Sequence, residues 1–412
     1  MRAARLEMQL ALEIMAALKA AAGEFAARHA GALASSAGAG SLAVYDDWID
    51  CAERTYGRRA RSREFCRLQA DLINVSCALR GDLAAAAALA FRQEGCSLRE
   101  EVWRLGKTAL YRYLPLPFVQ RAHARPLLIC YAQVNRPSVL DLEPRCSLIR
   151  RLAASGHAVY LIDWGYPGEA ERDTPLAHYL TDHIGGAVAH ILRTEACQAL
   201  DMIGICQGGT LSLCYAALHP RQVANLVLLG TPVDFQTPED LLSRWVAGLD
   251  TELVCRAGNM PGAALTAAFL ALAPFRLLQQ KYVHLLASGP SVADIQRFMR
   301  LERWIFDSPD QPATAFAQFL RWLYQENRLA RGELTLGGKR VRLERVRQPV
   351  LNVYATRDHI VPPAASQALR GRTASRDYAE LAVETGHIGM FVSRAAVDVP
   401  WTISAWLAER AR

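Results

Sequence analysis

The sequence predicts an α/β protein, with a parallel sheet covered by helices on both faces and a helical segment before it. Apolar runs typical of strands alternate with helical patterns from about Tyr111 to the C-terminus, and residues 237–332 interrupt this alternation once. The first quarter of the chain instead shows helical spacing and few strand signals. With 412 residues, 51% of them hydrophobic, the chain is long enough to form one large core and a smaller module.

The N-terminal quarter is predicted to be mostly helical. Apolar side chains recur at helical spacing in residues 1–29, whereas residues 31–41 are rich in Gly, Ala and Ser and predict a flexible linker. Helical character returns over residues 46–80 and continues over residues 83–104. We therefore expect residues 1–105 to form a helical N-terminal module.

Buried strands and helices are expected to alternate in the rest of the chain. Residues 125–134 form a continuous apolar run, which is typical of a strand buried on both faces of a sheet. Further strands are expected at residues 157–164, 199–205, 223–233, 348–358 and 377–387. Helices are expected at residues 147–156, 180–192, 210–220 and 395–410. Alternation of this kind predicts a parallel sheet with helices on both faces.

Residues 237–332 do not follow this alternation. They contain helical and aromatic-rich pieces and lie between two expected strands of the sheet. We therefore expect them to form a cap that is inserted into the core. The core itself would comprise residues 106–236 and 333–412.

Charge and cysteine content exclude several classes of protein. The net charge of +7 is modest and the Lys and Arg residues are scattered, which argues against nucleic-acid binding. The ten cysteines include no CxxC pair and several lie in apolar runs, so reduced thiols are expected rather than disulfides. No cluster has zinc-ligand spacing, and we expect neither a metal nor a cofactor.

The N-terminal sequence does not have the pattern of a signal peptide, because Glu7 and Glu13 interrupt the first apolar stretch. No uninterrupted apolar run reaches the roughly 18 residues that a membrane-spanning helix needs. We therefore expect a cytoplasmic protein without a transmembrane segment.

The central chemical signal is the segment Gly204-x-Cys206-x-Gly208-Gly209, which lies between an expected strand and an expected helix. A nucleophile elbow needs small residues at these positions, because its sharp turn crowds the neighbouring backbone. The turn would expose the cysteine at a helix N-terminus, where the helix dipole favours a thiolate. A buried structural cysteine beside an ordinary glycine turn would give the same motif. Only the surrounding sequence can distinguish a structural cysteine from a catalytic one.

The surrounding sequence favours a triad of the α/β-hydrolase type, in which the nucleophile, the acid and the His follow one another along the chain. Asp358 follows one expected strand and His387 follows the next, so both would lie at the edge where open α/β sheets collect their active sites. We predict that Cys206, Asp358 and His387 form a catalytic triad. His359 is a competitor for the base, but a base after the final strand can reach the elbow.

An oxyanion hole needs backbone N–H groups that point at the developing negative charge. The first donor is expected from Gln207, the residue after the nucleophile. The second is expected from the loop after the first buried strand, where Val134 or Asn135 is the candidate. Asn135 would also suit the turn before Arg136 and Pro137, and the two roles are compatible.

From about Tyr111 onward, the chain closely resembles the catalytic subunit of class III polyhydroxyalkanoate synthases. The resemblance rests on segments such as LLICYAQVNRP, VYLIDWGYP, GICQGGTLSLCYAALHP, ERWIFDSPDQ, LNVYATRDHIVPP and GHIGMFVS. It implies that the Cys, Asp and His of these motifs, here Cys206, Asp358 and His387, are catalytic. It also implies polymerisation of (R)-3-hydroxyacyl-CoA, usually of short chain length such as 3-hydroxybutyryl-CoA, into a polyester with release of CoA.

Residues 45–75 resemble the characteristic part of the non-catalytic partner subunit of the same synthases. This implies that the chain fuses a partner-like module to the catalytic domain and needs less help from a separate subunit, or none. An unrelated helical extension is the alternative. The chain departs from the family at Ala177 and His178, which replace a usual acidic pair. A homodimer and attachment to cytoplasmic polyester granules are also expected.

The expected reaction starts when His387 deprotonates Cys206, which attacks the acyl-CoA thioester. The 3-hydroxyl of one acyl unit then attacks a second acyl-enzyme, and Asp358 either orients His387 or helps to activate that hydroxyl. The apolar cap should exclude water, because hydrolysis would end the polymer chain. Two other functions stay open, namely a thioesterase or hydrolase on the same scaffold and a non-catalytic granule-associated scaffold protein.

Overall fold

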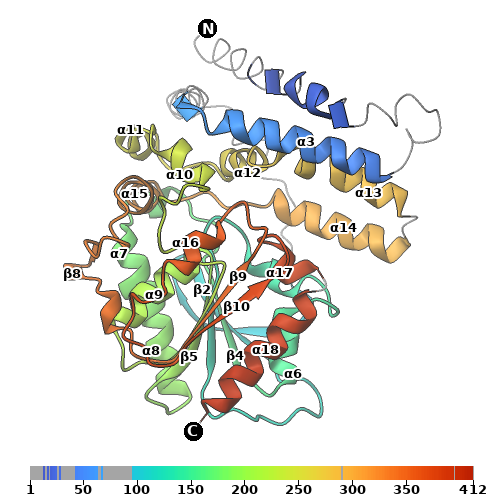
Figure 1. Cartoon of the computed structure of the whole chain (residues 1–412). Helices are drawn as coiled ribbons and strands as arrows, with labels where there is room; N and C mark the ends of the chain where they lie inside the picture. The colour runs from blue at the N-terminus through green and yellow to red at the C-terminus, as the bar shows by residue number, and fades with distance from the viewer. Residues whose placement is uncertain are drawn as a thin grey trace.

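The computed structural model describes residues 13, 16–17, 19–25, 27–28, 42–63, 66–67, 95–288, 291–393 and 395–411. An eight-stranded sheet lies at the centre, with helices on both of its faces (Figure 1). Cap helices lie above one end of the sheet, and the N-terminal helix α3 (Leu42–Ala60) lies on the far side of the cap (Figure 1). The predicted α/β fold with a cap and a preceding helical element is confirmed.

The strands of the sheet follow the order β1-β2-β4-β3-β5-β6-β9-β10. Their bounds are β1 Arg99–Leu105, β2 Thr108–Tyr113, β3 Leu127–Cys130, β4 Val159–Asp163, β5 Leu200–Ile205, β6 Val223–Leu229, β9 Val350–Ala355 and β10 Tyr378–Val383. From β4 to β10 all neighbouring strands are parallel, so their carboxyl ends meet at one edge of the sheet. That edge faces the cap (Figure 1).

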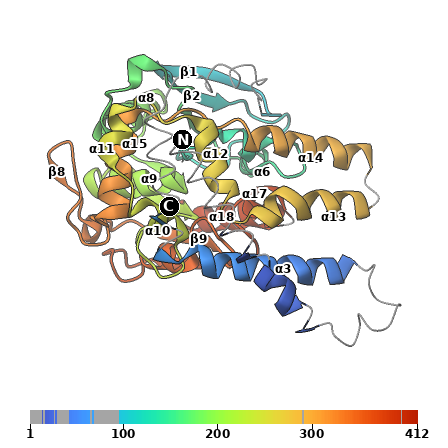
Figure 2. The ribbon, with the colours of Figure 1, turned by 90° about the horizontal axis from the view of Figure 1, so that it is seen from above.

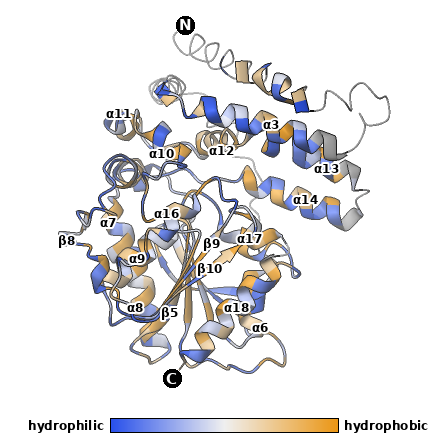
Figure 3. Ribbon diagram, viewed as in Figure 1, coloured by the Kyte–Doolittle hydropathy of each residue, from blue (hydrophilic) through white to orange (hydrophobic). Residues whose placement is uncertain are grey.

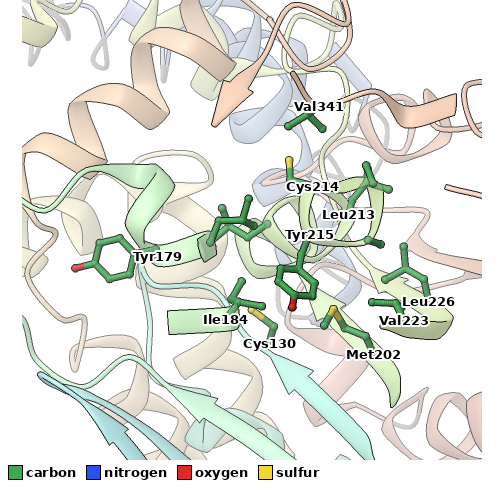
Figure 4. Packing of buried hydrophobic residues seen from close by; sticks show 14 of the residues in the cluster. Cys130, Tyr179, Ile184, Met202, Leu213, Cys214, Tyr215, Val223, Leu226 and Val341 are labelled. Atoms are coloured by element: carbon green, nitrogen blue, oxygen red, sulfur yellow. The ribbon is translucent and has the colours of Figure 1, made fainter. Parts of the chain in front are cut away.

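Two apolar layers cover the two faces of the sheet. The covering helices are α6 Leu148–Ala154, α8 Gly185–Thr194, α9 Gln207–Leu218, α16 Pro363–Gln367, α17 Gly389–Val392 and α18 Ala395–Glu409. Leu128 and Cys130 of β3 belong to the layer with α8 and α9, part of which Figure 4 shows. Leu127 and Ile129 belong to the layer with α6 and α18. Successive residues of a strand point to opposite faces of the sheet, and both sets are buried because helices cover both faces. The strands are accordingly largely hydrophobic (Figure 3).

The cap consists of short helices joined by tight turns. Its helices are α10 Leu241–Val246, α11 Thr251–Arg256, α12 Gly262–Leu270, η4 Arg276–Gln280, α13 Lys281–Ala287, α14 Val292–Ile305, α15 Ala313–Phe319 and η5 Leu320–Gln325. The remaining short elements are η1 Pro137–Asp141, η2 Glu169–Glu171, α7 Leu176–His178, η3 Tyr179–Ile184, β7 Thr335–Leu336, β8 Lys339–Arg340 and η6 Leu343–Arg345. Among the described residues, no helix is both long enough and apolar enough to cross a membrane.

Helix α3 packs on the cap rather than on the sheet (Figures 1 and 2). Tyr56 is 2% exposed, its hydroxyl donates to the carbonyl oxygen of Ala271 at 2.7 Å, and its ring meets Phe275 edge-on at 6.1 Å. Asp50 accepts a hydrogen bond from Arg276 at 2.6 Å. The N-terminal helix is therefore held to the segment between α12 and α13 by both apolar and charged contacts.

The sheet differs from the prediction at one edge. Helical character is predicted over residues 83–104, but Arg99–Leu105 is the edge strand β1, and the sheet is mixed because β2 is antiparallel to both β1 and β4. Leu105 pairs with Thr108 across a two-residue turn in which Gly106 has a φ of +55°. The charged, largely exposed residues of this edge strand look like the polar face of a helix in the sequence. Residues 31–41, for which the sequence predicts a linker, and residues 68–94, for which it predicts helix, lie outside the described residues.

Candidate active site

Cys206 lies at the sharp turn between β5 and α9. Its backbone has φ 53° and ψ −126°, a conformation that costs free energy for any residue with a Cβ atom. The turn is held because the Cys206 N–H donates to Leu229 O at 2.9 Å and the Cys206 carbonyl accepts from Gly209 N at 2.9 Å. The strained residue is therefore fixed by the neighbouring strand β6 and by the first turn of α9.

Glycines surround this turn because the backbone passes too close to other groups for a side chain. A Cβ atom on Gly204 would lie 2.6 Å from Gly209 Cα, and one on Gly208 would overlap the carbonyl oxygen of Tyr131. A Cβ atom on Gly209 would overlap the side chain of Thr231. The glycine pattern noted in the sequence thus corresponds to three separate close approaches, which is the crowding that a nucleophile elbow predicts.

Asp358 and His387 follow β9 and β10 and form a buried pair. His387 Nδ1 lies 2.6 Å from Asp358 Oδ2, and the two residues are 5% and 6% exposed, respectively. The other carboxylate oxygen, Oδ1, accepts hydrogen bonds from the N–H groups of Ile360 and Val361, both at 2.9 Å. Both oxygens of Asp358 are therefore engaged, and the imidazole is held in one orientation.

The electrostatics of His387 favour its charged form. Burial alone would lower the pKa of His387, but the charges of Asp358 and Cys206, together with hydrogen bonds to both side chains, raise it well above its usual value. Because Nδ1 bonds to Asp358, Nε2 is the ring nitrogen left for the thiol of Cys206. The competitor His359 is exposed, and Asp358 bonds to His387 rather than to it.

Gln207, the first candidate for the oxyanion hole, is the first residue of α9. Its N–H belongs to the first helical turn, where no carbonyl of the helix can accept it. Its side chain has a further contact, because Gln207 Oε1 accepts the backbone N–H of Gln133 at 2.9 Å. That bond engages the N–H of Gln133, so Val134 and Asn135 stay the two candidates for the second donor in this loop. The Asn135 side chain accepts a hydrogen bond from the Ser308 hydroxyl of the cap at 3.4 Å.

Two tyrosines near Cys206, the buried Tyr131 and the partly buried Tyr324, are not indicated by the sequence pattern. Burial first, and then the negative charge of Cys206, raises the pKa of Tyr131 well above its usual value. Burial, followed by the charges of Asp240 and Cys206, raises the pKa of Tyr324 in the cap well above its usual value. Both hydroxyls therefore stay protonated at neutral pH. Nothing in their spacing along the sequence places them beside the elbow.

The loop after β3 is tied to the segment after β4 and to the cap. Arg136 donates to Asp163 at 2.8 Å and to the carbonyl oxygen of Gly165 at 3.0 Å. Trp304 of the cap helix α14 donates to Arg136 O at 2.7 Å, and Trp164 donates to Tyr131 O at 2.8 Å. These bonds join the NRP, DWG and ERWIFDSPDQ segments of the sequence to one another and fix the loop after β3.

No metal site competes with this interpretation within the described ranges, where no group of three or more His, Cys, Asp and Glu side chains could hold a metal ion. The nine cysteines at described positions are free thiols. The arrangement of Cys206, His387 and Asp358 has the parts of a covalent acyl-transfer site, namely a nucleophile at a strained turn and a base with an orienting carboxylate.

Two protein families match separate parts of the chain. Residues 126–393 match the family described as alpha/beta hydrolase fold. Residues 24–109 match the family described as poly(R)-hydroxyalkanoic acid synthase subunit. The second match covers the N-terminal residues for which the sequence indicates a partner-like module.

Curated relatives match the larger part of the chain. The poly(3-hydroxyalkanoate) polymerase subunit PhaC of Allochromatium vinosum is 46% identical over 318 residues, which are 77% of this chain and 90% of that protein. The protein of the same name from Synechocystis is 41% identical over 327 residues, with 77% and 86% covered. Among solved structures, the enol-lactonase of Burkholderia xenovorans is 15% identical over 73% of this chain and 96% of that one, with a TM-score of 0.44.

Proposed function

The chain belongs to the class III polyhydroxyalkanoate synthases, and from this premise we propose that it polymerises (R)-3-hydroxyacyl-CoA through an acyl-enzyme on Cys206. The observation that carries the proposal is the buried His387–Asp358 pair, whose remaining ring nitrogen is available to a cysteine held at a strained turn. We propose Cys206 as nucleophile, His387 as general base and acid, and Asp358 as the residue that orients His387.

In the proposed acylation step, His387 Nε2 accepts the proton of the Cys206 thiol, and the sulfur attacks the thioester carbonyl carbon. The N–H groups of Gln207 and Val134 stabilise the resulting oxyanion. The tetrahedral intermediate collapses when the carbon–sulfur bond to CoA breaks. The proton on His387 then passes to the departing CoA sulfur, which leaves the acyl group on Cys206.

In the elongation step, the 3-hydroxyl of one acyl unit attacks the thioester of another, and His387 accepts the hydroxyl proton. An ester bond forms, and one cysteine is released as a thiol. The geometry supports an orienting role for Asp358 over direct activation of the hydroxyl, because its two oxygens already accept hydrogen bonds from His387, Ile360 and Val361. The carboxylate could accept one further hydrogen bond, but Asp358 is only 6% exposed.

A polymerisation assay tests the proposed function against a hydrolase on the same scaffold. Incubation of the purified protein with 3-hydroxybutyryl-CoA is expected to release CoA and to form a polyester that methanolysis converts to the methyl ester of 3-hydroxybutyrate. Free CoA accompanied by an equal amount of free acid, with no polymer, would instead identify a thioesterase. Absence of turnover with any 3-hydroxyacyl-CoA would favour a scaffold protein.

The division of the chain into an N-terminal module (1–105), a core (106–236 and 333–412) and a cap (237–332) is also a proposal. We propose that the N-terminal module acts on the cap within the same chain. Its helix α3 contacts η4 and α13, where Asp46 bonds to Gln280 at 3.0 Å and to His284 at 2.6 Å. A homodimer, a separate partner subunit and binding to the polyester granule surface stay predictions.

Substitution of Tyr56 in the full-length chain tests this proposal. Tyr56→Ala removes a buried ring and a hydrogen bond between α3 and the cap, which is expected to cost about 3 kcal/mol of docking free energy. We expect faster amide hydrogen exchange in residues 262–287 and lower polymerase activity, which an added partner subunit restores. Tyr56→Phe, which removes only the hydroxyl, should change both much less. Unchanged exchange and activity in Tyr56→Ala would contradict a role for α3 in seating the cap.

A further inference from the structure

The backbone of Gln133, in the loop after β3, is held at its N–H by Gln207 of α9 and at its carbonyl by Gln311 of the cap. We infer that Gln207 and Gln311 are positioning residues for the reaction, and that Gln311 makes the oxyanion hole depend on a seated cap. This inference rests on the proposed function, because it takes the Val134 N–H as the second oxyanion donor. It adds a residue of the cap to the machinery that sets the rate of acylation.

The contacts on this loop are direct. Gln311 Nε2 donates to the carbonyl oxygen of Gln133 at 3.0 Å, while Gln207 Oε1 accepts the N–H of Gln133 at 2.9 Å. The three side chains belong to residues that are between 2% and 6% exposed. Both bonds are therefore shielded from competing water, which makes them stronger than the same bonds at the surface.

The hydrogen bond from Gln311 also fixes the direction of the Val134 N–H, the proposed donor, because of the geometry of the peptide unit. The carbonyl of Gln133 and the N–H of Val134 belong to one planar peptide unit, and in a trans peptide they point in opposite directions. A side chain that fixes the direction of the carbonyl therefore fixes the direction of the N–H as well. A hydrogen bond to the carbonyl oxygen also polarises the unit and strengthens its N–H as a donor.

Gln311 is held firmly within the cap. Its hydrogen bond to the Gln133 carbonyl therefore depends on the position of the cap. Its backbone forms a two-way pair with Met260, with N–O distances of 2.8 and 2.9 Å, and its Nε2 group also contacts the carbonyls of Pro309 and Asp310 at 3.1 and 3.3 Å. The Val134 side chain packs against the cap cluster that contains Met260 and against the core cluster that Cys206 contacts. Movement of the cap away from the sheet would therefore pull on the carbonyl of Gln133 and on the side chain of Val134.

The substitution Gln311→Met tests the inference, because methionine has a similar size but cannot donate a hydrogen bond. We expect the first-turnover acylation by 3-hydroxybutyryl-CoA, measured as CoA release with enzyme in excess, to fall about 10- to 100-fold, since an oxyanion donor is misaligned rather than deleted. The alkylation of Cys206 by iodoacetamide should keep its wild-type rate and pH dependence. In alkylation the sulfur displaces iodide from a saturated carbon, so no oxyanion forms.

A matched control is available in the same part of the cap. Gln318 of α15 also joins the cap to the core, because its Oε1 accepts the N–H of Leu176 at 2.8 Å, but it does not contact the Gln133 loop in any of the described hydrogen bonds. Gln318→Met should acylate at close to the wild-type rate. Gln207→Met provides a second test at the same residue, because it releases the N–H of Gln133. The double variant should lose less than the product of the two single losses, because both substitutions act on the backbone of Gln133.

The possible outcomes separate the inference from the proposed function. Wild-type acylation rates in both Gln311→Met and Gln207→Met, in an enzyme that Cys206→Ala inactivates, would overturn the inference and leave the triad standing. Slower alkylation in step with slower acylation would also overturn it, because the loss would then lie in the nucleophile or the fold. Turnover that survives Cys206→Ala would instead overturn the proposed function itself.

Discussion

Replacement of Cys206 by alanine is expected to abolish CoA release and polymer formation, with a fall in rate on the order of a millionfold. The loss follows because no other described group combines a strained position at a helix N-terminus with contact to the buried His387. Cys206→Ser should retain only a small part of the activity, since a hydroxyl is much harder to ionise than a thiol. Steady-state CoA release and recovered polyester measure both effects.

Cys214→Ala is the matched control for this experiment. Cys214 lies two turns further along α9, is 1% exposed, and its pKa is raised to about 12 by burial, so it is a structural thiol. Its replacement should cost some stability through the cavity that it leaves, but should leave turnover in place. A Cys206→Ala enzyme that still forms polymer would exclude Cys206 as the nucleophile.

Asp358→Asn is expected to lower the polymerisation rate by about 10³- to 10⁴-fold while leaving the loop folded. The N–H groups of Ile360 and Val361 would keep the amide oxygen as their acceptor, so the amide NH₂ would face His387 Nδ1. Nδ1 would then have to accept a hydrogen bond, and the proton of neutral His387 would move to Nε2. A ring nitrogen that carries a proton cannot accept one from Cys206.

The same substitution has a predictable effect on stability as a function of pH. The folded-state pKa of His387 is raised above its unfolded value, so its protonation stabilises the fold fully below about pH 6.5, and this contribution is lost as the pH rises through the folded pKa. Asp358→Asn removes the main charge that raises this pKa. Urea unfolding should therefore show the largest deficit of the variant near pH 6 and a smaller one at alkaline pH.

Asp201→Asn is a matched control for Asp358→Asn. Asp201 is also a buried carboxylate, 4% exposed, but it lies at the opposite end of β5 and accepts a hydrogen bond from Asn225 at 2.7 Å. Burial raises its pKa to about 6. Its replacement should change neither the rate of polymerisation nor the protonation of His387, and an equal loss in both variants would contradict the orienting role of Asp358.

Much of the core could be predicted because its strands are buried on both faces and read as continuous apolar runs. The positions of Cys206, Asp358 and His387 after three strands of the sheet could be predicted for the same reason, since each of these strands is recognisable in the sequence. The sequence pattern predicts helix where the edge strand β1 lies, because the charged residues of β1 give no such run. Local pattern fails where a strand has only one neighbour and a solvated face.

The contacts of the loop after β3, which contains Gln133 and Val134, could not be predicted from the spacing of residues along the sequence. Gln133 and Gln311 are separated by 178 positions, and their hydrogen bond depends on how the cap returns to the sheet. The sequence predicts a role for the backbone N–H of Gln207, whereas its side-chain bond to Gln133 depends on the close approach of the loop after β3 to the turn at Cys206. Polar side chains of this kind are ambiguous in a sequence, because their partners come from remote segments.

The central claim is that the acyl chain is carried by Cys206, and peptide mass spectrometry tests it most directly. The full-length enzyme would be mixed with 3-hydroxybutyryl-CoA, quenched in acid within the first turnovers and digested. We predict 3-hydroxybutyryl groups, singly and as short oligomers, on Cys206. Cys214 should carry no acyl group. Polymer formation without any acyl group on Cys206, or with the acyl group on another residue, would contradict the account.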